Sequence, residues 1–514
     1  MTALLDALRQ TLGPDHVSAD PALRALMSQD IWARGGEAAL VIAPGNAAEC
    51  ARAIAQATAA GHAVVPRGGG MSYTGGYVGE SPGAVVLDLR RMNRVLVVRP
   101  EDRTVTVEAG CTWAQLDAAL KPHGLRTPFW GPLSGISSTI GGGLSQHNAF
   151  FGAGLYGTTA ESLVGLKVAL ADGSIIETGA GGYRFFGPDL AGLFLGDCGA
   201  FGVKLEATLR LIPRPAHEGW VSFSFADRDS ACAAMAAIGR EGLACELFGF
   251  DPNLARVRMK RASLMADAGA LLKVVGAQKS LLSGLKEGAK IALAGRDFLD
   301  DADYSLHAVV EGRSAARVAE DLAEITLMAQ SAGGRGVENT IPKVVRANPW
   351  TPLNNILGAE GERWAPVHGI IAMSRARDCW AAIDAVFDDR AARFGEHSVT
   401  TGCLTTTLST NGFLIEPVFY WPDERFALHD ATIEPGYLAK LARRDANPAA
   451  LAVVQEARAA VIDVFAHFQA AHFQVGRAYP LLARAAPEMR AMLGALKKSL
   501  DPRGVMNPGA LGLE

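Results

Sequence analysis

The sequence predicts an α+β protein with two domains, and three observations lead to that expectation. The chain has 514 residues, which is more than one hydrophobic core of ordinary size usually holds. Helical segments and short apolar runs alternate through the first part, and two separate loops there are rich in glycine. After a Pro-Arg-Pro turn at 213–215, strands are interspersed with alanine-rich helices. We expect one domain at 1–214, a second at 215–455, and a helical segment at 456–514.

Capping and turn residues place the elements of the first domain. Asn46 and Glu49 form a pattern typical of a helix start, and Gly61 ends that helix. Thr112 is a second expected cap, for a helix that ends near Gly124. Strands are expected at 63–66, 84–89, 95–98 and 104–108, a hairpin at 164–170 and 174–177, and strands of the second domain at 221–225 and 305–310.

Composition and charge exclude several classes of function. The net charge is −4 and the basic residues are spread along the chain, so no surface of the kind that binds nucleic acid is expected. The seven cysteines contain no C-x-x-C pair, which favours reduced thiols over disulfides or a zinc site. The amino terminus lacks the pattern of a signal peptide, and no run is long and apolar enough to span a membrane. We therefore expect a cytoplasmic protein.

One segment leaves a weak contact with a membrane surface open. Residues 271–295 interleave apolar side chains with Lys273, Lys279, Lys286 and Lys290, as in a basic amphipathic helix. Such a helix would place the protein at the periphery of the inner membrane. The alternative interpretation is a helix that packs on its own domain.

The first glycine-rich loop extends from Pro66 to Gly76 and follows an expected strand. Its sequence is PRGGGMSYTGG, with five glycines among nine consecutive positions. Glycine accepts positive φ angles and lets a ligand approach the main chain, so the backbone N–H groups of such a loop can surround a diphosphate. A simple flexible turn is the alternative.

A second loop supports the diphosphate interpretation. It has the sequence PLSGISSTIGGG at 132–143 and again combines stacked glycines with small hydroxyl side chains. Neither loop has the G-x-G-x-x-G spacing that opens a nicotinamide-binding helix. Two such loops predict a long ligand with a diphosphate in its middle.

The order of these segments resembles the vanillyl-alcohol-oxidase/PCMH flavoprotein superfamily, and most closely its D-lactate dehydrogenase and glycolate oxidase branch. The loop RGGGMSYTGG is similar to the diphosphate loop of that family, and SSTIGGGLSQHNAF is similar to its second loop. DLAGLF with the following GAFGV, and the terminal DPRGVMNPG, resemble two more of its motifs. The resemblance is dense over 40–214 and over the last forty residues, and thin between them.

The resemblance implies a PCMH-type FAD-binding domain of two subdomains, an α+β substrate domain that caps it, and a C-terminal segment that returns to the FAD domain. FAD is the implied cofactor. Some relatives attach the flavin to a histidine of the first loop, but Met71 stands there, so we expect non-covalent FAD. Attachment at His147 in the second loop is the alternative. The implied FAD contacts are Pro66, Arg67, Gly68, Gly69, Gly70, Met71, Ser72, Gly75, Gly76, Pro132, Ser137, Ser138, Gly141, Gly142, Ser145, Gly202, Val203 and Asn507.

The chain departs from the metal-dependent relatives at the positions of their metal ligands. Those relatives carry an H-x-G-D-G-N-x-H segment and a later E-H-G. Phe413 and Tyr420 stand where the first segment has its two histidines, and Phe473 stands at the histidine of the second. Because phenylalanine cannot bind a metal and phenol is a poor ligand beside imidazole, we expect no catalytic metal.

With no metal expected, other side chains have to move the proton of the substrate hydroxyl. His472 is the expected base because the pKa of histidine lies near neutrality. Tyr420 would polarise the substrate oxygen, Glu416 would orient either residue, and Arg477 would bind a carboxylate through two hydrogen bonds. Structural roles in the core or in an ion pair are the alternatives for Tyr420 and Arg477.

A further segment resembles the aromatic-alcohol oxidising members of the superfamily. It is RWAPVHG at 363–369, and it adds His368 to the catalytic candidates. Aromatic residues near this segment and near Glu416 are expected to form an apolar pocket wall. These are Trp350, Trp364, Phe419, Tyr420 and Trp421.

The expected function is an FAD-dependent oxidoreductase that oxidises a hydroxylated carbon by hydride transfer to the flavin N5. The family resemblance favours a D-2-hydroxy acid such as D-lactate, whereas the aromatic residues favour an aromatic alcohol or phenol. A sugar or aldonolactone oxidase, and a catalytically degenerate flavin protein that serves as an electron-transfer partner, are further alternatives. The electron acceptor (quinone, cytochrome, flavoprotein or oxygen) stays open, and a homodimer is common in the resembled family.

Overall fold

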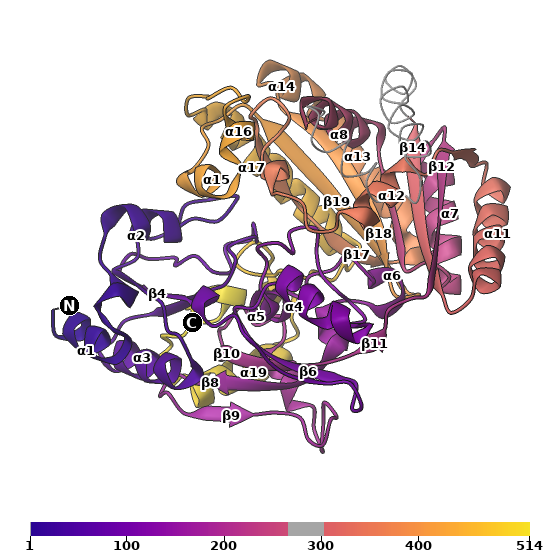
Figure 1. The fold of residues 1–514 in the computed structure, drawn as a ribbon. Helices are drawn as coiled ribbons and strands as arrows, with labels where there is room; N and C mark the ends of the chain where they lie inside the picture. The colour runs from indigo at the N-terminus through magenta and orange to yellow at the C-terminus, as the bar shows by residue number, and fades with distance from the viewer. Residues whose placement is uncertain (1, 266–302) are drawn as a thin grey trace.

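The computed structural model describes residues 2–265 and 303–514, which form two packed parts (Figure 1). Two sheets with their helices make up the part that contains both ends of the chain. A large antiparallel sheet with its helices makes up the other part. This arrangement confirms the predicted α+β class, while the domain boundaries at 214/215 and 455/456 stay predictions.

The first sheet has the strand order β1-β2-β4-β3, in which β2, β4 and β3 run parallel. Helix α3 begins where the sequence predicts, because the Asn46 side chain accepts from the Glu49 N–H at 3.0 Å and donates to Glu49 Oε1 at 2.8 Å. Apolar side chains of α1 and α3 are buried against the strands. The elements are α1 (Thr2–Leu12), β1 (Val17–Ser18), α2 (Pro21–Met27), β2 (Leu40–Ile42), α3 (Ala47–Ala59), β3 (Val64–Arg67) and β4 (Val85–Asp88).

The second sheet is antiparallel, in the order β5-β6-β10-β8-β9, and a short pair of strands, β7 and β11, lies apart from it. The predicted hairpin forms between β8 and β9, and the predicted strands β5 and β6 pair with each other. Thr112 caps α4 as predicted, through a capping box with Gln115. The elements are β5 (Val95–Arg99), β6 (Thr104–Glu108), α4 (Trp113–Leu120), β7 (Leu125–Arg126), α5 (Ile140–Gln146), α6 (Ala153–Tyr156), β8 (Leu163–Ala169), β9 (Ile175–Glu177), β10 (Val203–Arg210) and β11 (Ile212–Pro213).

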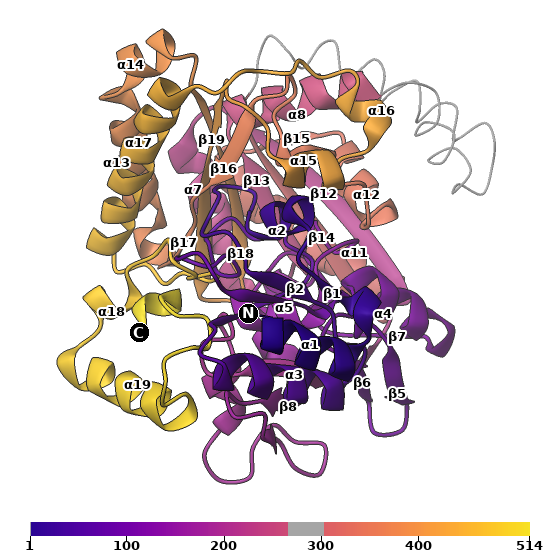
Figure 2. The same cartoon turned by 90° about the vertical axis from the view of Figure 1, so that its left-hand side faces the viewer.

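The large sheet of the second part has the order β15-β12-β14-β13-β18-β19-β16 in the described residues, and β17 also pairs with β19. Helices α7, α11, α13 and α17 bury one face of it, and Figure 2 shows α13 and α17 side by side there. The predicted strands at 221–225 and 305–310 lie within β12 and β14. The strands are β12 (His217–Phe225), β13 (Glu246–Phe250), β14 (Tyr304–Gly312), β15 (Arg335–Val337), β16 (Arg363–Pro366), β17 (Gly369–Ala372), β18 (Thr400–Leu408) and β19 (Gly412–Trp421).

Strand β19 connects this helical layer with the first part of the molecule. Successive side chains of a strand point to opposite faces of the sheet. Phe413 and Ile415 accordingly join the core beneath the helices, whereas Leu414 and Tyr420 join a cluster with Phe151 of the first part. Because both faces are covered, the strand is almost continuously apolar, and Glu416 is an exception that faces the first part.

The last segment of the chain returns to the first part, which confirms this element of the predicted fold. Met506 pairs with Val64 at the edge of β3, and the Val64 N–H donates to the Val505 carbonyl at 2.8 Å. Apolar side chains of α19 pack on the core of the second sheet. The remaining helices are α7 (Arg228–Glu241), α8 (Pro252–Met265), α11 (Ala315–Ser331), α12 (Thr340–Ala347), α13 (Ala376–Asp388), α14 (Ala391–Glu396), α15 (Ala427–Thr432), α16 (Pro435–Leu438), α17 (Pro448–His467), α18 (Leu481–Arg484) and α19 (Pro487–Leu500).

The predicted amphipathic helix at 271–295 lies outside the described residues. Within residues 2–265 and 303–514, no helix combines the length and the apolar character that crossing a bilayer requires.

Candidate functional site

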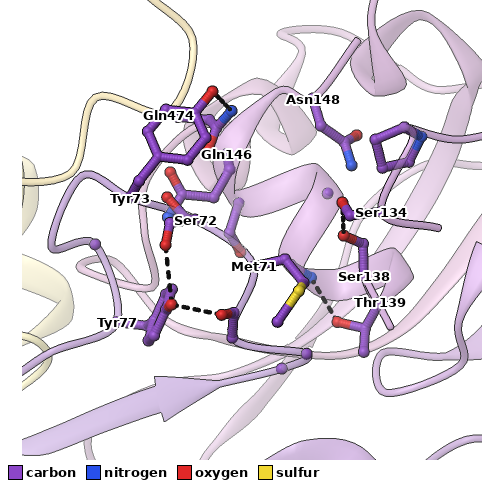
Figure 3. Close-up of a pocket in the computed structure, with 18 of the residues that line it drawn as sticks. Met71, Ser72, Tyr73, Tyr77, Ser134, Ser138, Thr139, Gln146, Asn148 and Gln474 are labelled. Carbon is purple, nitrogen blue, oxygen red and sulfur yellow. Dashed lines mark hydrogen bonds between the residues drawn. The ribbon is translucent and has the colours of Figure 1, made fainter. Parts of the chain in front are cut away.

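A large cavity lies between the two parts of the molecule and contains about 1590 Å³ of empty space, some of it open to solvent. Both glycine-rich loops line it: the first loop follows β3, and the second leads into α5. Strands β18 and β19, helix α8 and residues 473–474 of the C-terminal segment supply the opposite wall. Figure 3 shows side chains of both loops and Gln474 around this space.

The first loop is held by hydrogen bonds to its own carbonyls and to the chain before it. The Tyr77 hydroxyl donates to the carbonyls of Gly70 at 2.7 Å and Ser72 at 3.0 Å, as Figure 3 shows. The buried Arg67 guanidinium donates to the Gln29 carbonyl at 2.7 Å. Gly70 has a φ of +70°, so the turn needs a residue that tolerates the left-handed region. These contacts fix the loop with its main chain toward the cavity.

The two loops touch each other through main chain, and this contact requires glycine. A Cβ on Gly69 would lie 1.9 Å from the Ser137 carbonyl oxygen, and one on Gly68 would lie 2.3 Å from Thr139 Oγ1. Thr139 in turn caps α5 by accepting from the Gly142 N–H at 3.2 Å. The glycines therefore let one loop lie directly on the other.

This arrangement fits FAD. Two bare main-chain segments meet along one wall of a long cavity, which suits the diphosphate of a dinucleotide. The opposite wall carries a carboxyl group and aromatic side chains beyond the loops. The side of the cavity at the large sheet is therefore where a substrate would lie if FAD were bound on the two loops.

Most of the residues predicted to contact FAD line the cavity. Three do not: Gly75 and Ser137 lie beside lining residues of their loops, and Asn507 donates to the Gly76 carbonyl at 2.8 Å. Their predicted contacts with FAD stay predictions, as do those of the lining residues. The lining residues of the predicted set are Pro66, Arg67, Gly68, Gly69, Gly70, Met71, Ser72, Gly76, Pro132, Ser138, Gly141, Gly142, Ser145, Gly202 and Val203.

Glu416 is the carboxyl group of the cavity and belongs to a short hydrogen-bonded chain. The Tyr73 hydroxyl lies 3.3 Å from Glu416 Oε2, and Gln474 Nε2 donates to the same hydroxyl at 3.2 Å. Burial raises the pKa of Glu416 to about 7, against the opposing effects of the Tyr73 hydrogen bond and the positive charge of Arg258. A carboxyl group with this pKa can exchange a proton near neutral pH.

Among the described residues, the walls around Glu416 combine the Arg258 guanidinium with apolar surface. Arg258 of α8 lines the cavity, and its guanidinium lies 4.0 Å from the centre of the Phe250 ring. Trp364, Leu414 and Phe473 also line the cavity, and the Trp364 ring packs against Tyr73. A substrate there meets a carboxyl group, a guanidinium and aromatic surface.

His472 and His368 lie behind this wall and do not line the cavity. His472 Nδ1 is 2.7 Å from the His368 carbonyl oxygen, and its Nε2 is 3.2 Å from an Arg484 nitrogen. Burial lowers the pKa of His472 to about 4 and that of His368 to about 3. Both rings pack with Tyr479, and His368 Nε2 contacts the Phe473 carbonyl. The catalytic roles predicted for them stay predictions that this placement does not favour.

Arg477 braces the first loop against the end of the chain. Its guanidinium donates to Asn507 Oδ1 at 2.8 Å and to the Pro508 carbonyl at 2.6 Å, and it also contacts the Gly75 carbonyl. It does not line the cavity, so the carboxylate contact predicted for it is not supported by its position.

The predicted aromatic wall is only partly present. Trp364 lines the cavity, but Phe419 and Trp421 point into the core beneath the helices. Tyr420 is buried in the cluster next to the cavity, and the Trp350 ring packs on the second loop, where Cβ atoms at two glycines would touch it. The prediction failed for Phe419 and Trp421 because strand alternation places them on the other face of β19.

His147, the alternative attachment point for flavin, is also outside the cavity lining. It ends α5 with a φ of +54°, and its ring packs on Gly196. Burial lowers its pKa to about 4.

One group of potential metal-binding atoms occurs in the described residues, away from the cavity. Ligand atoms of Cys245, Glu246 and Glu311 lie within 4.8 Å of one another. Arg346 lies 3.0 Å from Glu246 and pairs closely with Glu311, and Arg126 pairs with Glu311 as well. Since two arginines already compensate these carboxylates, the group is an ion-pair network.

Sequence reasoning missed Tyr73, Gln474 and Arg258. Tyr73 lies within the first loop, which was interpreted from its glycines alone. Its hydroxyl group, between those glycines, could have identified it as a candidate site residue. Gln474 follows Phe473, the position compared with a metal-binding histidine. Arg258 lies on a helix with no motif, so no local signal identifies it.

Comparisons with known proteins agree with this geometry. A family profile described as an FAD binding domain matches residues 38–179. Glycolate oxidase subunit GlcD of Bacillus subtilis (strain 168) is 33% identical over 212 residues, which are 41% of this chain and 45% of that protein. D-2-hydroxyglutarate dehydrogenase of Xanthomonas citri pv. viticola is 32% identical over 246 residues, 48% of this chain and 52% of that protein. The alignments span about half the length of these curated relatives.

The fold as a whole is found among solved structures. p-Cresol methylhydroxylase with substrate bound superposes with a TM-score of 0.74 at 16% identity, over 100% of this chain and 97% of that one. The sequence match identifies the cofactor domain, and the structural match identifies the fold. The chain therefore carries an FAD binding domain at residues 38–179, has FAD as its cofactor and has the fold of p-cresol methylhydroxylase.

Proposed function

We propose that the protein oxidises a 2-hydroxy acid at its hydroxyl-bearing carbon, with non-covalent FAD and without a metal. The observation that carries this proposal is Glu416, a half-buried residue whose carboxyl group has a pKa of about 7 and lies in the same cavity as both glycine-rich loops. The names of the relatives, glycolate oxidase and D-2-hydroxyglutarate dehydrogenase, support a hydroxy acid as the substrate.

The oxidation removes a proton and a hydride from the substrate and leaves a carbonyl group. Bound FAD supplies the acceptor for the hydride. Ionised Glu416 takes the hydroxyl proton, which replaces the role predicted for His472. A base with a pKa near the working pH is ionised in a large enough fraction of the molecules and is still strong enough to accept a proton.

Arg258 is the proposed partner of the substrate carboxylate. It lines the cavity near Glu416, and guanidinium groups bind carboxylates through two parallel hydrogen bonds. A 2-hydroxy acid between Arg258 and Glu416 would turn its hydroxyl toward the base. This assignment replaces the one predicted for Arg477.

An aromatic alcohol is the second candidate substrate. Trp364, Leu414 and Phe473 give the substrate end of the cavity an apolar surface that suits a ring.

Anaerobic reduction of the purified protein tests the proposal. The flavin absorbance is followed while D-lactate, other 2-hydroxy acids and aromatic alcohols are added, each with and without a chelator. We expect bleaching by a 2-hydroxy acid that the chelator leaves unchanged. Bleaching that the chelator abolishes would contradict the metal-free mechanism, and bleaching by aromatic alcohols alone would select the second candidate. A flavin that no compound reduces would favour the electron-transfer partner considered from the sequence.

A further inference from the structure

Three distant parts of the chain meet at Glu416. Tyr73 comes from the first glycine-rich loop, Glu416 from β19 of the large sheet, and Gln474 from the C-terminal segment. All three line the cavity, and Figure 3 shows the hydrogen bond between Tyr73 and Gln474.

The donor and acceptor properties of these groups fix the direction of the hydrogen bonds from Gln474 to Tyr73 and from Tyr73 to Glu416. The Gln474 amide nitrogen is only a donor, so the Tyr73 oxygen accepts from it at 3.2 Å. The Tyr73 hydrogen is then available to Glu416 Oε2, 3.3 Å away. An ionised carboxylate is only an acceptor, so this arrangement matches the charged form of Glu416.

Besides Tyr73, titratable groups of three other described elements interact with Glu416. Arg258 of α8 supplies a positive charge that favours the ionised form. Tyr479 of the C-terminal segment and Cys403 of β18 also interact with Glu416, but burial raises the pKa of both, so both are neutral near pH 7. Tyr73 is thus the neutral group that donates a hydrogen bond to the carboxylate.

We propose that Tyr73 is a positioning residue that holds the Glu416 carboxylate toward the substrate, and that Gln474 sets the direction in which the Tyr73 hydroxyl donates. The inference rests on the proposed function only where it names Glu416 as the proton acceptor. The hydrogen bonds among Gln474, Tyr73 and Glu416 are present in the structure without a bound substrate. Because Tyr73 lies in the first loop, its hydrogen bond links the glycine-rich part of the chain to Glu416, the residue that accepts the proton.

Infrared titration of the holoenzyme tests this inference without a substrate. The Glu416 carboxyl band is identified by its absence in Glu416→Gln, and its protonation is followed against pH in the unmodified protein and in Tyr73→Phe. Loss of a hydrogen bond to the charged form makes ionisation harder, so we expect the midpoint to rise by about one pH unit in Tyr73→Phe. Gln474→Leu should raise it by a smaller amount.

Tyr77→Phe is the matched control. It makes the same chemical change in the same loop, and Tyr77 donates to the carbonyls of Gly70 and Ser72 rather than to Glu416. We expect it to lower flavin content and leave the midpoint in place. Equal midpoints in Tyr73→Phe and the unmodified protein, or equal shifts in both tyrosine variants, would overturn the inference. Retained flavin reduction in Glu416→Gln would instead contradict the proposed function and leave the titration result standing.

Discussion

At the scale of single residues, the contact between the two glycine-rich loops depends on the absence of one carbon atom. The methyl group of Gly69→Ala would lie 1.9 Å from the Ser137 carbonyl oxygen, which is main chain and cannot rotate away. Such overpacking costs about 1–3 kcal/mol. Because the loops are the predicted binding site of the FAD diphosphate, we expect FAD affinity to fall by roughly tenfold to a hundredfold. Fluorescence titration of the apoprotein with FAD measures this.

A glycine with free space around it provides the control. Gly494 lies inside α19 at an ordinary backbone angle, and an added Cβ would meet nothing within 4 Å. Gly494→Ala should leave FAD affinity unchanged and stabilise the fold by about 0.5–1 kcal/mol, since alanine restricts the unfolded chain. Equal FAD affinity in both alanine variants would show that the loops do not need their present contact.

Glu416 shows why a residue's role depends on its surroundings. In water a glutamate is too weak a base for an alcohol proton at neutral pH, whereas burial here raises its pKa to about 7. His472 illustrates the reverse, because burial lowers its pKa to about 4 and its ring nitrogens already have partners. Residue type alone favoured the histidine.

At the scale of elements, a buried ion-pair network ties α12 to three strands of the large sheet. Arg346 of α12 binds Glu218 of β12 at 2.7 Å and Glu246 of β13 at 3.0 Å, and it also pairs with Glu311 of β14. Arg346→Ala leaves these carboxylates with less compensation in a buried place. We expect a loss of about 3–5 kcal/mol in unfolding free energy, measured by denaturant titration.

An exposed pair of the same type is the control for that loss. Arg377 and Asp378 lie 3.3 Å apart, but their side chains are 64% and 66% exposed. Exposed pairs contribute about 0–1 kcal/mol, so Arg377→Ala should change stability very little. A similar small effect for Arg346→Ala would mean that the network carries no stability.

The elements that the sequence predicts well are those with local signals. Asn46 and Thr112 mark their helices because the capping partners lie three residues away, and the hairpin at β8 and β9 follows from its turn. Which face of β19 meets the cavity was not available from the sequence, since both faces are apolar. Phe419 and Trp421 were misplaced for that reason.

At the scale of the whole molecule, the site exists only where distant parts of the chain converge. The glycine-rich wall of the cavity could be predicted because its glycines gather in two short segments that resemble a known family. Tyr73, Arg258, Glu416 and Gln474 could not be grouped, because long-range packing alone brings them to one cavity. The sequence predicted that the C-terminal segment, which contains Gln474, returns to the first part of the molecule. It did not predict that Gln474 lines the cavity.

The rate of anaerobic flavin reduction against pH, in the unmodified protein and in Glu416→Gln, tests the central claim most directly. Glu416 must be ionised to accept a proton, and its raised pKa places that ionisation near pH 7. With the substrate that bleaches the flavin, we expect the rate to rise with pH through about 7 and then level off. Glu416→Gln should bind FAD normally but be slower by roughly 10²- to 10⁴-fold, with no such rise. A Glu416→Gln variant that keeps both the rate and the pH dependence of the unmodified protein would contradict the account.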